Sequence, residues 1–208
     1  MFAAIEDQFA ATAPTPKGRR ARRAIFRAMR AAVAEGGVDA ASLDSVADGA
    51  GLTQAALRHY FPTRDALVSA FFKSGADWYR QALQALLTTS DKPPREQLAD
   101  CLRWHFEFME EVESIFWLES SAYWLRDAEG RKIRDAWYGW LTDRYAALIG
   151  RARPEFPPAE RRRRAYVLWT LVLGGWVTHG RGSPSRRALP APERRRVLID
   201  AALSIALG

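Results

Sequence analysis

The chain has 208 residues, of which 48% are hydrophobic, and a formal net charge of +7. A chain of this length and hydrophobicity can bury a substantial core, which excludes overall disorder. One cysteine and three histidines exclude a disulfide framework and a cysteine or histidine metal site, and the positive charge favours an anionic partner such as nucleic acid.

Residues 1–16 contain two prolines and few large apolar side chains, so we expect a loose leader. Acidic residues precede the basic ones in this segment, which is the wrong order for a secretory signal. A first helix is predicted near Arg19 to Glu35, and it should stop at Gly36 and Gly37.

The start of that helix is rich in basic residues and holds no acid. We expect it to contact DNA phosphates, and the alternative is a solvated arginine-rich helix. Its basic residues are Lys17, Arg19, Arg20, Arg22, Arg23, Arg27 and Arg30. Similar runs at 161–164 and 194–196 are far from it in sequence, and for these we favour solvated charge.

The run from Leu43 to Leu67 predicts two short helices joined by a tight turn. Gly51 supplies the positive φ that ends the first helix, and Thr53 is a natural N-cap for the second. Leu57 returns to the core at helical spacing, as do Tyr60 and Phe61. The residues left pointing outward are Gln54, Ala55, Arg58 and His59, in the position from which a recognition helix reads the major groove. We also expect Ser42, just before the first of these helices, at the DNA.

Pro62 ends the second helix, because a following proline disfavours α geometry at Phe61. Thr63 then caps a long helix that runs to about Leu87. Its start would support the two-helix motif and its end would enter a second core.

The segment GLTQAALRHYFPTRDAL resembles the helix-turn-helix signature of the TetR family of bacterial transcriptional regulators, and the likeness covers about residues 19–75. It implies that Thr53, Gln54, Ala55 and His59 face DNA and that Tyr60 and Arg64 contact phosphates. Arg58 stands where the family commonly has tyrosine, which would allow bidentate reading of guanine. The resemblance also implies a homodimer on a palindromic operator, a small-molecule effector bound in the C-terminal domain, and repression.

We therefore expect an all-α protein of two domains. A three-helix DNA-binding domain should span 17–75, and a ligand-binding and dimerisation domain 76–208. The helices predicted in the second domain are 95–112, 114–125, 129–149, 165–178 and 193–207.

The segment 165–178 is apolar on every face and too short to span a bilayer. Such a helix needs cover on all sides, which predicts a four-helix dimer interface with the last helix. The alternative is a core helix buried within one subunit. The residues predicted at the interface are Leu168, Trp169, Val172, Gly175, Trp176, Leu198, Ala201 and Ile205.

Five of the eight tryptophans lie between residues 104 and 140. Large rings on converging helices can line an apolar pocket and would suit a cationic ligand. The residues predicted to line it are Trp104, His105, Phe108, Trp117, Tyr123, Trp124, Trp137 and Trp140. His105, Glu119, Ser120 and Tyr123 could orient the ligand by hydrogen bonds. The alternatives are that most tryptophans fill the core and that His105 is a core histidine.

No nucleophile motif, phosphate-binding glycine loop or convincing carboxylate pair is present, so we expect no enzyme and no catalytic residue, cofactor or metal. The predicted function is a cytoplasmic regulator that binds double-stranded operator DNA as a homodimer, has no membrane partner, and is released by an apolar or aromatic effector. An architectural DNA-binding protein without an effector is the competing hypothesis, and it would show little preference for one sequence.

Overall fold

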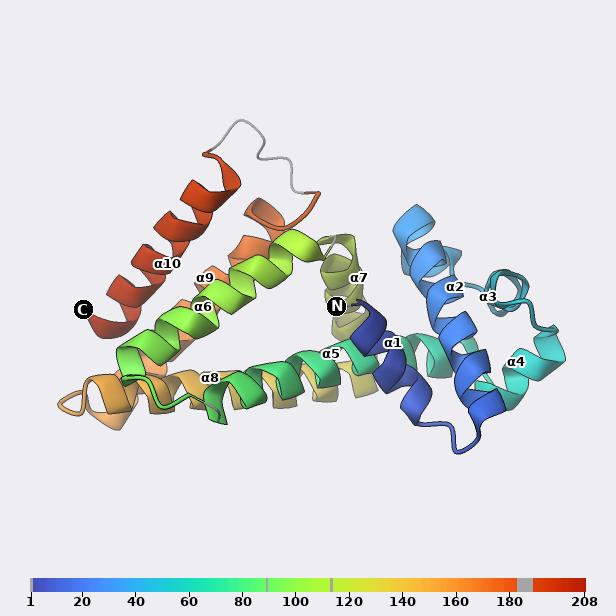
Figure 1. Cartoon of the computed structure of the whole chain (residues 1–208), viewed down its shortest axis with the longest axis horizontal. Coiled ribbons are helices and arrows are strands. Elements are labelled where there is room, and N and C mark those ends of the chain that lie inside the picture. The colour runs from blue at the N-terminus through green and yellow to red at the C-terminus, as the bar shows by residue number, and fades with distance from the viewer. Residues whose placement is uncertain (1, 89, 113, 183–188) are drawn as a thin grey trace. The chain divides into compact units, whose positions relative to one another are not determined.

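The computed structural model describes residues 2–88, 90–112, 114–182 and 189–208. This part of the chain forms ten helices and no strand, which confirms the predicted all-α class (Figure 1). The helices are α1 (Phe2–Ala11), α2 (Pro16–Ala40), α3 (Leu43–Ala50), α4 (Gln54–Tyr60), α5 (Arg64–Thr88), α6 (Pro94–Glu111), α7 (Ser114–Arg126), α8 (Ala128–Ala152), α9 (Pro158–Thr178) and α10 (Ala191–Leu207).

The chain divides into two compact units. The N-terminal unit comprises Met1–Ala82 and Glu119–Gly130, and the C-terminal unit comprises Leu83–Leu118 and Arg131–Gly208. The predicted division lies between residues 75 and 76, and no pattern in the sequence indicates that a stretch of α7 and α8 joins the N-terminal unit. Helices α5, α7 and α8 each contain residues of both units.

Helix α1 replaces the loose leader that the sequence analysis predicts. Its buried residues Ile5, Phe9 and Ala10 pack in the N-terminal unit. The Phe9 ring lies 5.5 Å from the Phe26 ring and 5.6 Å from the Phe61 ring, measured between centroids. A ten-residue helix is marginal on its own in water, so tertiary packing rather than helix propensity stabilises it.

Local sequence signals form α2, α3 and α4 much as predicted. Helix α2 contains a non-helical break at Gly36 and Gly37, where the sequence predicts its end. Ser42 caps α3 in a capping box with Ser45, and Gly51 follows α3 with φ of 65°. The Thr53 side chain then accepts a hydrogen bond from the Ala56 N–H and caps α4.

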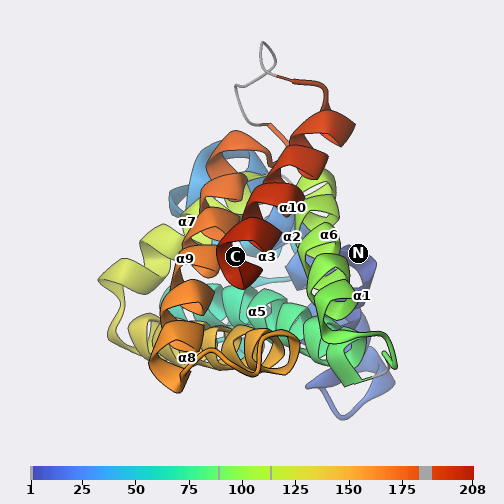
Figure 2. The same cartoon turned by 90° about the vertical axis from the view of Figure 1, so that its left-hand side faces the viewer.

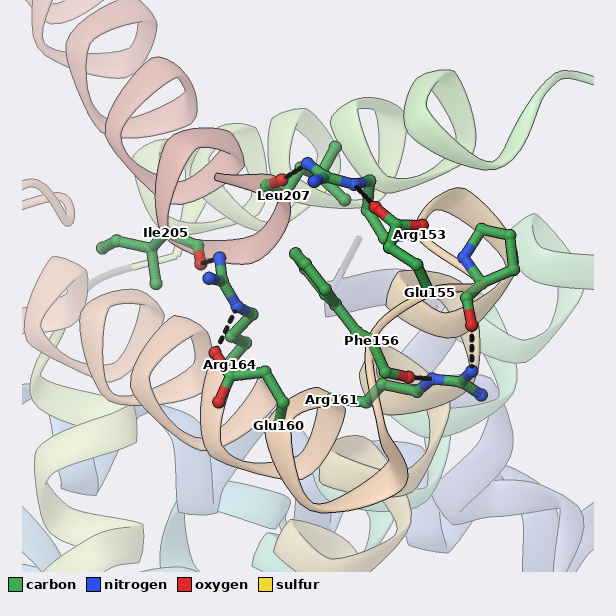
Figure 3. Close-up of polar contacts among 9 residues, drawn as sticks. Arg153, Glu155, Phe156, Glu160, Arg161, Arg164, Ile205 and Leu207 are labelled. Atoms are coloured by element: carbon green, nitrogen blue, oxygen red, sulfur yellow. Dashed lines mark hydrogen bonds and ion pairs between the residues drawn. The ribbon is translucent and has the colours of Figure 1, made fainter.

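In the C-terminal unit, α10 packs against both α6 and α9, and α6 also packs against α9 (Figure 2). Arginines fasten the end of α10 to the segment around α9, as Figure 3 shows. Arg164 donates to the Ile205 carbonyl at 2.9 Å, and Arg153 donates to the Leu207 carbonyl. Cations favour the C-terminal end of a helix, so the arginines at 153 and 164 have a structural role here.

None of the helices in the described ranges combines the length and the apolar character that crossing a membrane requires.

Candidate nucleic-acid interface and effector region

The outer face of α4 is formed by the residues that the sequence predicts there. Gln54, Ala55, Arg58 and His59 are exposed, whereas Leu57 on the inner face is fully buried. The Gln54 amide donates to the Asp44 carboxylate of α3, so one member of this face is held by a neighbouring helix. Contact of the face with DNA stays a prediction.

The flanking residues Ser42 and Thr53 are exposed and act as helix caps. Tyr60 is half-buried, and its ring meets His59 edge to face at a centroid distance of 5.5 Å. Thr53 and Tyr60 flank the exposed face of α4 along the chain, whereas Ser42 lies at the start of α3.

The guanidinium of Arg64 is turned toward the backbone rather than presented to a phosphate. Its Nε donates to the Ala41 carbonyl at 3.0 Å and its Nη2 donates to the Val38 carbonyl at 2.6 Å. Hydrogen bonds from a charged donor to backbone carbonyls are among the stronger ones in proteins. The structure thus gives Arg64 a role in holding the connection between α2 and α3, which the resemblance did not indicate.

Arg22 is also occupied within the fold. Its guanidinium donates to the Phe9 carbonyl at 3.4 Å and to the Thr12 hydroxyl, and it lies over the Phe61 ring at 4.7 Å. Burial lowers the pKa of Arg22 from its ordinary value. These contacts join α2 to α1 and to Phe61 at the end of α4, and a phosphate contact of Arg22 stays a prediction.

Helix α1 and the turn after it engage most of the basic run that the sequence assigns to phosphate binding. Arg23 pairs with Asp7 at 2.8 Å and Arg27 pairs with Glu6 at 2.8 Å. Arg19 donates to the carbonyls of residues 13 and 14, and the Arg30 guanidinium lies 3.8 Å from the centroid of the Phe2 ring. We call the contacts of Arg19, Arg23, Arg27 and Arg30 with α1 and the turn after it the arginine cover. The sequence missed them because α1 was taken for a loose leader.

Neutralising the two acids of the arginine cover, with Glu6→Gln and Asp7→Asn together, is expected to strengthen binding to random duplex DNA. The ion pair of Arg23 with Asp7 is exposed, and such pairs contribute little to stability. Glu6 is 13% exposed, but glutamine keeps its size and can still accept a hydrogen bond, so the variant should stay folded. If the released Arg23 and Arg27 reach phosphates, the slope of log affinity against log salt should steepen by about 1–2. Filter binding or fluorescence anisotropy at several salt concentrations measures this slope.

The control for this change carries the same charge difference elsewhere. Asp91→Asn with Glu96→Gln alters two exposed acids of the C-terminal unit. We expect the control to leave the slope unchanged. If the wild type and the α1 variant have equal slopes of log affinity against log salt, the acids of α1 do not keep Arg23 and Arg27 from binding phosphates.

One aromatic chain in the C-terminal unit joins several predicted effector residues. Trp104 lies 5.4 Å from Phe108, Phe108 meets Trp176 edge to face at 5.6 Å, and Trp176 stacks on Trp117 at 5.8 Å. Trp104, Phe108 and Trp117 are half-buried. We call these four residues the aromatic chain. Trp104, Phe108 and Trp117 are predicted pocket-lining residues, whereas Trp176 is predicted at the subunit interface.

Two other predicted lining residues connect to the aromatic chain through Trp169, since His105 lies 5.4 Å from Trp104 and 6.1 Å from Trp169. Trp137 is buried against Trp169, with ring centroids 5.6 Å apart, and Trp140 is half-buried further along α8. Trp124 and Tyr123 belong to the N-terminal unit. The sequence therefore grouped residues of two different units, because closeness along the chain does not determine which core a ring enters.

His105 is fully buried and shares a hydrogen bond with the Tyr145 hydroxyl. Burial lowers its pKa to about 3, so the imidazole is neutral at physiological pH. These features favour the core-histidine alternative.

An open pocket of about 140 Å³ in the C-terminal unit has a lining that the sequence did not predict. Ligand pockets usually measure about 300–1,000 Å³, so this one is too small for a drug-sized effector. It is lined by Gln84, Leu87, Arg144, Ala147, Leu148 and Arg151.

The face of α9 that the sequence assigns to a dimer interface is buried in the chain's own core. All five predicted positions on this helix are buried: Leu168, Trp169, Val172, Gly175 and Trp176. A Cβ at Gly175 would lie 3.0 Å from the Met109 sulfur and 3.1 Å from the Phe106 ring, so the close approach that the glycine allows is to α6. The assignment of these residues to a subunit interface is corrected.

The opposite face of α9 is apolar and exposed. Tyr166, Val167 and Val177 expose 67%, 47% and 52% of their surface. On α10, Val197 is 47% exposed and Ala201 is exposed, whereas Leu198 and Ile205 are half-buried. We call the exposed apolar residues of both helices, Tyr166, Val167, Val177, Val197 and Ala201, the outer α9/α10 face. An apolar helix offers two candidate faces to sequence reasoning, and on α9 the predicted residues lie on the face that the subunit itself buries.

Residues 25–71 match the family model described as bacterial regulatory proteins of the tetR family. This segment is similar to the DNA-binding part of TetR-family transcriptional regulators. The matched residues run from α2 through α3 and α4 into α5, which is the part of the structure that forms the predicted helix-turn-helix. Regulators of this family are DNA-binding proteins and not enzymes.

Solved structures share the fold of this chain. A protein from Pseudomonas aeruginosa PAO1, assigned as a transcriptional regulator, is 18% identical with a TM-score of 0.76, covering 93% of this chain and 92% of that one. An assigned regulator from Saccharomonospora viridis in complex with choline is 19% identical with a TM-score of 0.69, covering 86% and 94%. AibR, in complex with isovaleryl coenzyme A and operator DNA, is 18% identical with a TM-score of 0.67, covering 89% and 97%. No curated protein gives a significant sequence match.

Proposed function

We propose that the chain is a TetR-family regulator that represses transcription by binding a palindromic operator as a homodimer and is released by a small effector. The observation that carries the proposal is the exposed polar face of α4, with Arg58 beside His59 and Gln54, within the matched family segment. Such a face can enter the major groove, and Arg58 can donate two hydrogen bonds to guanine.

The proposed homodimer forms through the outer α9/α10 face. Tyr166, Val167 and Val177 are large apolar residues that water covers in the single subunit. A second copy of the same face would bury them in a four-helix arrangement. Pairing would place two α4 helices one turn of duplex apart, about 34–36 Å, or a multiple of it.

The proposed effector is apolar or aromatic, and a cation is compatible with it. The rings of the aromatic chain can hold such a ligand by apolar contact and by cation–π attraction. The Trp169 indole N–H is buried and has no acceptor among the described residues, so it could donate to an oxygen of the effector. The relatives described above bind choline and isovaleryl coenzyme A, which makes these compounds the first probes.

The test of the DNA-binding proposal compares Arg58→Ala with the wild type on an operator selected from a random duplex pool. If Arg58 reads a base, the preference for the operator over random duplex should fall by about 1–3 kcal/mol. Electrophoretic mobility shift titrations of both duplexes measure this preference. Addition of choline or isovaleryl coenzyme A to the same assay tests release by an effector.

Lys73→Ala is the control, because it removes one positive charge from α5, where Lys73 pairs with Asp77. It should leave the preference unchanged. If Arg58→Ala weakens operator and random duplex equally, Arg58 contacts a phosphate and not a base. If the pool yields no preferred sequence, the architectural hypothesis is favoured.

A further inference from the structure

The break in α2 is covered by a carboxylate from α7. Gly37 has φ of 73° and ψ of −174°, so the peptide that follows it leaves the helical hydrogen-bond pattern. The Val38 N–H donates to Oε2 of Glu119 at 2.9 Å. The other carboxylate oxygen, Oε1, lies 2.9 Å from the place that a Cβ on Gly37 would occupy. The position of the Glu119 carboxylate therefore depends on two features of Gly37. Its backbone angles turn the Val38 N–H toward the carboxylate, and the lack of a side chain leaves room for Oε1.

Val38 is also held through its carbonyl, by Arg64 of α5. The Val38 carbonyl accepts from Arg64 Nη2 at 2.6 Å, and Arg64 Nε donates to the Ala41 carbonyl at 3.0 Å. Ser42 then caps α3 directly after this connection. The start of α3, and the α4 that follows it, thus depend on a connection fixed by one acid and one arginine. A second contact of α7 lies one helical turn after Glu119, where Tyr123 packs against Phe72 of α5 with ring centroids 5.7 Å apart.

Helix α7 also carries contacts of the C-terminal unit. The Ser114 N–H donates to the Arg181 carbonyl at 2.9 Å, and the Ser114 hydroxyl donates to the Trp176 carbonyl of α9 at 2.7 Å. Trp117 stacks on Trp176, with 1° between the ring planes. A single helix of 13 residues therefore contacts α9 through residues 114 and 117, and α2 and α5 through residues 119 and 123. A helix moves largely as a rigid element, so displacement at residue 117 reaches residue 119.

We propose that Glu119 is the positioning residue through which α7 sets the placement of α3 and α4 for DNA binding. This rests on the proposed function, since it concerns regulation of the same DNA-binding face. Movement of the aromatic chain shifts α7, the Glu119 carboxylate transmits the shift to the Val38 peptide, and α3 and α4 follow. Because coupling between two sites is reciprocal, operator binding at α4 also perturbs Trp117.

The experiment uses the full chain labelled with 5-fluorotryptophan, with the Trp117 signal assigned through Trp117→Phe. Saturating operator should shift the ¹⁹F signal of Trp117 in the wild type and in Glu119→Gln, whose amide oxygen still accepts from the Val38 N–H. Glu119→Ala should lose the shift at saturation and bind operator about 5- to 150-fold more weakly, the range of ordinary coupling energies. Its affinity for random duplex should not change.

Glu35→Ala is the matched control, since it removes an exposed carboxylate two residues before Gly37. It should behave as the wild type. The proposal is overturned if saturating operator does not shift the ¹⁹F signal of Trp117 in the wild type. It is also overturned if operator shifts this signal in Glu119→Ala as much as in the wild type. A purely structural Glu119 would weaken folding and both kinds of DNA binding together and would leave the Trp117 shift intact.

A second arm needs no DNA. Trp176→Phe removes the indole that stacks on Trp117, and it should shift the Val38 amide resonance in the wild-type and Glu119→Gln backgrounds but not in Glu119→Ala. This arm separates the two proposals. If no operator is found but the Val38 resonance behaves as expected, the DNA-binding proposal fails and the coupling through Glu119 stands. An unchanged Val38 resonance in every background overturns the coupling.

Discussion

Replacing Gly37 with alanine is expected to destabilise the N-terminal unit by about 1–3 kcal/mol through backbone strain. With φ of 73° and ψ of −174°, Gly37 occupies a region that is essentially restricted to glycine. The new methyl group would also lie 2.9 Å from the Glu119 carboxylate, so α7 must move or the Val38 hydrogen bond must break. Urea unfolding followed by far-UV circular dichroism measures the change.

Gly75→Ala is the control for this experiment and should have the opposite sign. Gly75 lies inside α5, and a Cβ built there meets nothing within 4 Å. Alanine at such a position stabilises by about 0.4–1 kcal/mol, because it reduces the freedom of the unfolded chain. A Gly37→Ala protein as stable as the wild type would show that the break in α2 is not held in the strained geometry.

Placing a charge on the outer α9/α10 face, with Val167→Asp, is expected to abolish dimerisation and to weaken operator binding by about 10²–10⁴-fold. The carboxylate would be buried without a partner in the proposed interface, which is strongly unfavourable. A monomer binds only one half-site and loses the gain in effective concentration that the second half-site supplies. Analytical ultracentrifugation measures the association state, and mobility shift titration measures operator affinity.

The matched control is Ala136→Asp, which adds the same charge at an exposed position of α8. It should remain dimeric and bind operator as the wild type does. Folding of both variants is checked by circular dichroism. A dimeric Val167→Asp protein would place the subunit contact outside the outer α9/α10 face.

The parts of the fold that sequence predicted well depend on neighbours a few residues away. Gly51 and Thr53 act through hydrogen bonds and backbone angles within one turn of helix, so their roles as turn and cap were readable from spacing. The same holds for the burial of Leu57 and the exposure of Arg58, which follow from the helical period.

The roles that sequence missed depend on contacts between segments far apart in the chain. Arg22 and Arg64 were assigned to phosphates by residue type and family position, but the carbonyls that hold them are those of Phe9, Val38 and Ala41. Glu119 was considered only as a ligand contact, and its partner lies 81 residues earlier. No periodicity or local motif indicates such pairs.

The packing of α1 has a practical consequence for work with this protein. Phe9 lies between Phe26 and Phe61, and the acids of α1 occupy two arginines of α2. A protein shortened to begin at Pro16 would expose apolar rings and unpaired guanidinium groups on the same surface. Such a preparation should copurify with nucleic acid and aggregate. The DNA affinities measured with it would differ from those of the full chain. Affinity tags are therefore better placed where they leave α1 intact.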